Sequence, residues 1–204
     1  MRKRLTAAVL VLASISLAGC TINLGSADKD DSGMMGENSM MGNKSVGSSS
    51  FSGADIMFAQ MMIPHHQQAV DMGTLAETHA LSPEVKTLAA TIKAEQAPEI
   101  EQMNGWLTDA NASLDMGHDM GHDMGHDMGM GGMLSDAEMT ALENAKGATF
   151  DRLYLEGMIN HHKGAIHMAQ MVVDSNNAEA KALGESIIKS QTAQIKYMEA
   201  LLAK

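Results

Sequence analysis

Apolar residues recur every three or four positions in two stretches of the chain, and the two stretches are copies of each other. Residues 55–72 and 151–168 each contain a His-His pair in the same register, ninety-six positions apart. On a helix of about 3.6 residues per turn, each copy has one apolar stripe. We expect one imidazole per copy to face the core. The stripes are Phe58, Met61, Met62, His65, Ala69 and Met72, then Tyr154, Met158, His161, Ala165, Met168 and Val172.

Capping residues predict where the helices of the first copy begin. Ser52 or Asp55 caps a helix that extends to about His79. Ser82 caps a second helix, which starts with Pro83 and runs to about residue 110.

The second copy has similar signals. Ser135 and Glu138 form a capping box, which predicts a helix from there to about Asp174 with a break near Gly147, because glycine weakens a helix. A turn at residues 176–177 leads into a last helix over about 178–202.

The repeat continues in the second helix of each copy, where residues 96–103 match residues 191–198. Each copy is therefore a helical hairpin, and two hairpins joined by a long linker predict an all-α four-helix bundle. We expect this domain over residues 52–204. Its parts are a first hairpin at 52–111, a linker at 112–134 and a second hairpin at 135–204.

The N-terminal 20 residues have the order of an export signal, with a basic start followed by an apolar run. They end in Leu-Ala-Gly-Cys, which resembles the bacterial lipobox, so Cys20 is expected to carry a lipid that anchors the protein to a membrane. The alternative is a free buried cysteine after an ordinary signal. Residues 21–51 are rich in Gly, Ser, Asn and Asp, and we expect a disordered tether.

Charge and cysteine content limit the possible partners. The formal net charge of −11 argues against nucleic acid, because phosphate binding depends on Lys and Arg, and it favours cations. Cys20 is the only cysteine, which excludes a disulfide within the chain and a zinc site built on cysteines.

The two stripes combine imidazole nitrogen with thioether sulfur. This soft to borderline donor set suits Cu(I) and Ag(I) and tolerates Cu(II). Methionine at helical spacing is also common as a core filler, and a histidine on an apolar stripe is often a hydrogen-bonded core residue. The same His and Met register in both copies, within a chain of 21 methionines, favours metal ligands.

The linker between the copies repeats Met-Gly-His-Asp. Frequent glycine disfavours a stable helix there, and the His-rich composition indicates a metal-binding tract without fixed geometry. Its candidate ligands are Met116, His118, Met120, His122, Met124, His126 and Met128.

The two His-His motifs resemble those of a bacterial family known as domain of unknown function 305. They read Met-Ile-Pro-His65-His66 and Met-Ile-Asn-His161-His162, each followed by Ala and Met. The resemblance covers about residues 52–204 and implies a ferritin-like four-helix bundle. It also implies copper binding outside the cytoplasm, with silver as a second candidate ion, in metal tolerance. By position it assigns the ligands Met61, Met62, His65, His66, Met72, Met158, His161, His162 and Met168.

The leading interpretation is an extracytoplasmic copper-binding lipoprotein that sequesters the metal or hands it over, with other copper-handling proteins as candidate partners. Ferritin-like bundles also host di-iron oxidases, which need Glu-x-x-His motifs. Here Met62 and Met158 stand three residues before His65 and His161, so we expect no enzyme. A metal-dependent oxidase of another kind and a structural envelope lipoprotein are the alternatives.

Overall fold

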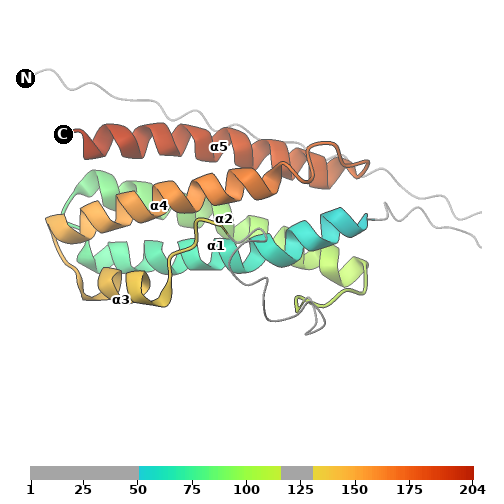
Figure 1. Cartoon of the computed structure of the whole chain (residues 1–204), viewed down its shortest axis with the longest axis horizontal. Coiled ribbons are helices and arrows are strands. Elements are labelled where there is room, and N and C mark those ends of the chain that lie inside the picture. Colours follow the sequence, from blue (N-terminus) through green and yellow to red (C-terminus); the bar gives the residue numbers. More distant parts are fainter. Residues whose placement is uncertain (1–50, 116–130) are drawn as a thin grey trace, which may run out of the picture. The chain divides into compact units, whose positions relative to one another are not determined.

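The computed structural model describes residues 51–115 and 131–204, and the regular elements of this part of the chain are all α-helices. One hairpin consists of α1 and α2, the other of α4 and α5, and α1 packs against α4 (Figure 1). The predicted all-α bundle of two hairpins is confirmed, with a short additional helix, α3. The predicted tether, the lipidation site Cys20 and linker residues 116–130 lie outside the described residues. The helices are α1 (Gly53–His79), α2 (Pro83–Asp109), α3 (Asp136–Asn144), α4 (Ala148–Ala169) and α5 (Ala178–Leu202).

The helices begin where local capping chemistry places them. The side chain of Ser52 accepts a hydrogen bond from the backbone N–H of Asp55 at 3.2 Å, and the Asp55 carboxylate accepts one from the Ser52 N–H at 2.7 Å. Ser135 and Glu138 form the same reciprocal pair at the start of α3. Each capping box satisfies backbone donors that the first helical turn leaves unpaired.

Gly147 separates α3 from α4, as the sequence predicted. Its φ of 66° lies in the left-handed region that favours glycine, and its N–H donates to the carbonyl of His79 at 2.8 Å. The predicted end of the following helix near Asp174 is wrong, because α4 ends at Ala169. The next residues continue as tight turns, in which the N–H of Val172 bonds the carbonyl of Ala169 at 3.2 Å.

Polar contacts tie the two copies together. The carboxylate of Asp151, in the first turn of α4, accepts hydrogen bonds from the backbone N–H groups of Leu81 and Ser82 in the loop between α1 and α2, at 3.0 and 2.8 Å. On another side of the bundle, Nε1 of Trp106 on α2 donates to Glu179 on α5 at 3.2 Å. These contacts fix the two hairpins against each other.

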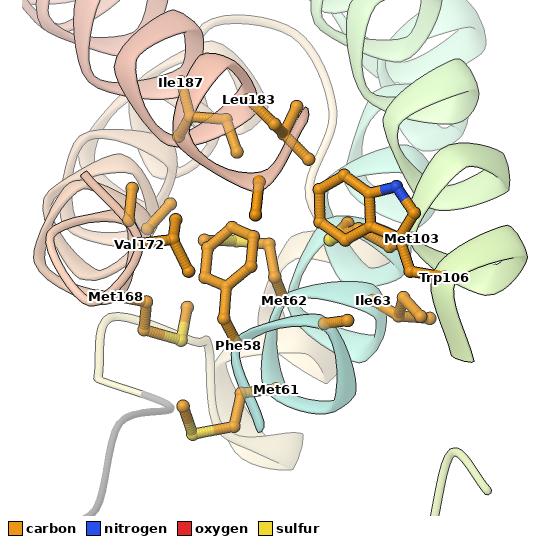
Figure 2. Close-up of a cluster of buried hydrophobic side chains, with 14 of the residues drawn as sticks. Phe58, Met61, Met62, Ile63, Met103, Trp106, Met168, Val172, Leu183 and Ile187 are labelled. Atoms are coloured by element: carbon orange, nitrogen blue, oxygen red, sulfur yellow. The ribbon is translucent and has the colours of Figure 1, made fainter. Parts of the chain in front are cut away.

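The core consists of two clusters of buried side chains, and every residue of the two predicted stripes is buried. Figure 2 shows the first cluster, in which Phe58, Met62 and Trp106 come from α1 and α2 and Met168 and Leu183 come from α4 and α5. Both hairpins thus contribute to one core. Within the described parts of the chain, no helix is both long and apolar enough to cross a lipid bilayer.

Candidate metal site

Both histidines of each pair are buried. The side chains of His65, His66, His161 and His162 are all 0% exposed. His65 and His161 are thus buried as their stripes predict, but His66 and His162 are buried as well, so each copy buries two imidazoles and not one. The first histidine of each pair lies between α1 and α4, whereas the second meets a polar side chain of the other helix in its own hairpin.

The imidazoles of His65 and His161 contact each other where α1 and α4 pack together. Their ring centroids lie 3.7 Å apart and their planes differ by 38°. Nε2 of His161 lies 2.8 Å from the backbone oxygen of His65, and Nε2 of His65 lies 3.4 Å from the backbone oxygen of Gly131. The second contact is long for a hydrogen bond and therefore weaker. The repeat has thus brought two equivalent histidines together between α1 and α4.

The second histidine of each pair has a side-chain partner in its own hairpin. Nε2 of His66 lies 2.8 Å from Oε2 of Glu99 on α2. Nε2 of His162 lies 2.7 Å from Oε1 of Gln194 on α5. Glu99 and Gln194 occupy equivalent positions of the repeat, so the two hairpins build the same arrangement with a carboxylate in one and a carboxamide in the other.

All four Nδ1 atoms are buried and have no hydrogen-bond partner. Each Nε2 faces an oxygen that can only accept, since the amide nitrogen of Gln194 is the donor to Glu95. In a neutral imidazole the proton then lies on Nε2 and the lone pair on Nδ1. Metal-binding histidines in proteins are held in this way, with the second ring nitrogen donating to a carboxylate or carbonyl. Four lone pairs are therefore held inside the bundle without a partner.

Burial also keeps the imidazoles of His65, His161 and His162 uncharged. It lowers the pKa of His65 to about 3, with a further contribution from His66, and it lowers the pKa of His162 to about 4. Burial lowers the pKa of His161 as well, to well below its usual value, and the neighbouring His65 adds to the effect. The neutral form is the one that binds a metal ion, so at neutral pH no proton has to leave these three rings first.

The five thioether ligands predicted in the bundle are buried, and the two core clusters divide them. Met61, Met62 and Met168 belong to the first cluster, whereas Met72 and Met158 belong to the second. Figure 2 shows the first group around Phe58. Each cluster therefore takes methionines from both copies of the repeat.

Among the described residues, no three side chains of His, Cys, Asp or Glu converge as ligands for one metal ion. The buried donors that this core offers are imidazole nitrogens and thioether sulfurs. Such a donor set suits a soft monovalent ion and does not suit hard cations, which prefer several oxygen ligands.

Sequence reasoning did not single out four buried or half-buried polar side chains on α2 and α5. The signal was available in the second half of the repeat, where the same residue types recur on an otherwise apolar face. Gln96 and Gln191 are both 2% exposed and contain amide atoms without a partner, as is unusual for buried polar groups. The four residues are Gln96 and Glu99 on α2 and Gln191 and Gln194 on α5.

The end of the linker lies across α1 and α4 beside this site. Gln68 on α1 donates to the carbonyl of Leu134 at 2.9 Å and accepts from its N–H at 2.8 Å. The backbone of Gly131 approaches Gly164 on α4 so closely that an added Cβ there would lie 1.6 Å from the Gly131 oxygen. The linker residues predicted as ligands, Met116 to Met128, lie outside the described residues.

The fold and site define an all-α bundle of two repeated hairpins with His-His pairs in a methionine-rich core. The chain belongs to the family described as Domain of unknown function (DUF305), whose model matches residues 55–202.

Solved structures of similar chains agree with this assignment. A DUF305 protein of Streptomyces coelicolor, described as secreted, is 36% identical, with a TM-score of 0.67 over 74% of this chain and 92% of that one. A DUF305 fragment from Deinococcus radiodurans is 28% identical, with a TM-score of 0.66 over 74% of this chain and 97% of that one. The Cu(II)-bound form of CopM is 34% identical, with a TM-score of 0.59 over 72% of this chain and 94% of that one. A search of curated proteins finds no match.

Proposed function

We propose that this protein binds copper outside the cytoplasm, and silver in its place, and that it sequesters the metal or hands it to other copper-handling proteins. The two His-His pairs and the buried methionines are the proposed binding site, and the metal is cargo rather than a catalyst. Cys20 is the proposed lipid anchor, which holds the domain at a bacterial membrane.

The observation that carries this proposal is the set of four buried Nδ1 atoms without partners. An unpartnered polar atom in a protein interior costs about 1–3 kcal/mol, so four of them in repeat-equivalent histidines need an explanation. A bound soft metal ion supplies one, because it takes up lone pairs that have no hydrogen-bond partner. The methionines of both clusters add thioether sulfur to the same core.

The similarity to CopM supports copper and silver as the ions. Solved forms of CopM include Cu(I)-bound and Ag-bound structures, at 32% and 30% identity to this chain. Binding is favoured over di-iron chemistry by the residues themselves, since Met62 and Met158 occupy the places where a Glu-x-x-His motif has its carboxylates.

Thermal unfolding with and without Cu(I) tests the site. A ligand that binds only the folded state stabilises it by RT ln(1 + [L]/Kd), about 2.7 kcal/mol at one hundred times Kd. For a domain of this size we expect the wild-type melting temperature to rise by roughly 5–10 °C. His65→Gln, His161→Gln and the double variant should lose most of this rise, because glutamine is polar and similar in size but lacks the imidazole donor.

Two further sets of variants make the result specific. Met62→Leu and Met158→Leu preserve volume, so they should cost under about 1.5 kcal/mol in the apo protein while reducing the copper-induced rise. His167→Gln is the matched control, because His167 lies on α4 but is exposed. An undiminished rise in the double histidine variant would show that the copper binds elsewhere.

A further inference from the structure

The two hairpins differ in the side chain that meets the second histidine of each pair. Gln96, Ile100 and Met103 on α2 have the identical residues Gln191, Ile195 and Met198 on α5. Between them, Glu99 of the first hairpin is replaced by Gln194 in the second. These are the residues that accept hydrogen bonds from the buried imidazoles of His66 and His162, at 2.8 and 2.7 Å.

The hydrogen bonds of His162 also lead to a carboxylate, but Gln194 lies between the imidazole and that carboxylate. Nε2 of Gln194 donates to Oε2 of Glu95 on α2 at 2.7 Å. This contact fixes the orientation of the amide, so its oxygen faces His162. Both imidazoles are thus connected to carboxylates of α2, His66 directly to Glu99 and His162 through an intervening neutral amide.

The two carboxylates also differ in their access to water. The Glu99 side chain is only 17% exposed where it meets His66. Glu95 is exposed and lines a groove of about 380 Å³ between α2 and α5, together with Gln194 and Tyr197. Solvent screens the charge of Glu95, whereas the charge of Glu99 acts on His66 through a mostly buried hydrogen bond.

A carboxylate that accepts from a metal-binding imidazole makes the ring a stronger donor and places negative charge near the metal. Both effects stabilise the ion of higher charge. We propose that Glu99 and Gln194 set the oxidation-state preference of the two halves of the site. The His66 half favours Cu(II), and the His162 half favours Cu(I) and Ag(I). This inference rests on the proposed function, because it assumes that these histidines bind copper.

Two variants test the inference, one that removes a carboxylate from His66 and one that places a carboxylate beside His162. Glu99→Gln removes the carboxylate from His66 with little change in shape. The double variant Glu95→Gln/Gln194→Glu keeps the net charge and moves a carboxylate from the groove onto His162, where the amide introduced at position 95 can donate to it. Glu101→Gln is the matched control, because Glu101 is exposed on the same helix and the substitution removes the same charge.

The measurement is the affinity of each variant for Cu(I) and for Cu(II), in competition with chelators, and the ratio of the two. Changes in the partner of a metal-binding histidine typically alter affinity by about 10–100-fold. Glu99→Gln should lower the Cu(II) affinity relative to Cu(I) by about this factor, which raises the apparent one-electron potential by roughly 59 mV per tenfold change. The double variant should change the ratio in the opposite direction, and Glu101→Gln should leave it unaltered.

The affinity ratio separates this inference from a purely structural role of the two residues. A residue that only orients its imidazole would alter both affinities alike, and an unchanged ratio in both variants would therefore overturn the inference while copper binding itself stands. Wild-type protein that binds neither ion would overturn the proposed function and this inference with it.

Discussion

The burial of single imidazoles determines how the apo domain responds to pH. In the unfolded chain a histidine binds a proton below about pH 6.5. In the folded domain, burial lowers the pKa of His65 to about 3 and of His162 to about 4, and it lowers the pKa of His161 well below its usual value. Between these limits the unfolded state binds more protons than the folded state. The free energy of unfolding therefore falls as the pH falls below about 6.5.

We predict that the metal-free domain loses stability between pH 7 and pH 5, before most carboxylates titrate. Each of the three histidines contributes a slope of up to about 1.4 kcal/mol per pH unit below its unfolded pKa. Urea unfolding at several pH values measures the slope. His162→Gln should reduce it by removing one of the linked protons. A free energy of unfolding that stays constant over this range would show that the imidazoles are protonated in the folded state as readily as in the unfolded one.

Sequence reasoning found the four histidines but not their surroundings. Burial of His65 and His161 followed from helical periodicity, which is a local property of the chain. His66 and His162 hydrogen-bond to Glu99 and Gln194, which are about thirty residues away and lie on neighbouring helices. No periodicity within one helix reveals such a partner. Only the repeat between the second helices of the two copies marked those positions in advance.

At the scale of helices and loops, the starts of the elements were predictable because capping is local. Ser52, Ser82 and Ser135 cap helices as the sequence predicted, and Asn177 caps the last one. The end of α4 was not predictable from the sequence, because Val172 remains buried although the α-helix has ended at Ala169. Tight turns keep the apolar period for a few residues, so periodicity alone overestimates the length of the helix.

The close contact between the end of the linker and α4 leads to a second prediction. An alanine Cβ at Gly164 would lie 1.6 Å from the oxygen of Gly131 and 2.6 Å from its carbonyl carbon. Backbone atoms cannot be displaced as easily as the end of a side chain. Gly164→Ala should therefore destabilise the domain by about 1–3 kcal/mol in urea unfolding, although alanine favours helix. The Gly131 carbonyl should also move away from His65.

Gly105 supplies the control for this prediction. It lies within α2, is exposed, and an added Cβ would have no neighbour within 4 Å. Gly105→Ala should stabilise the domain by about 0.5–1 kcal/mol through helix propensity alone. If Gly164→Ala stabilises the domain by the same amount, the linker end does not pack on α4 in solution.

At the scale of the whole molecule, each core cluster contains methionines of both copies, and a methionine in one cluster has its repeat equivalent in the other. Met62 from the first copy shares a cluster with Met168 from the second and with Met103. Their repeat equivalents, Met158, Met72 and Met198, share the other cluster. Neither hairpin alone supplies all the methionines of one cluster. The duplication in the sequence predicted two hairpins, but the exchange of methionines between them follows from the packing of α1 against α4.

We expect the core of the bundle and the Met-Gly-His-Asp linker to bind metal ions independently of each other. The linker repeat supplies imidazole and carboxylate as well as thioether, so we expect it to bind Cu(II), Zn and Ni with little selectivity. The bundle should bind copper or silver in preference to Zn and Ni. Replacing residues 116–130 by a Gly-Ser segment of equal length leaves Gly131 and Leu134 in place on the bundle.

The replacement should reduce the total number of metal ions bound per chain, measured by equilibrium dialysis with Zn and Cu(II), because the linker imidazoles are gone. It should leave the Cu(I)-induced rise in melting temperature intact, because that rise comes from the folded core. The complementary protein keeps the linker and contains His65→Gln and His161→Gln, and it should bind Zn but lose the thermal rise. If the Gly-Ser replacement abolishes the thermal rise and the histidine variant retains it, the linker is the copper site and the buried imidazoles serve packing alone.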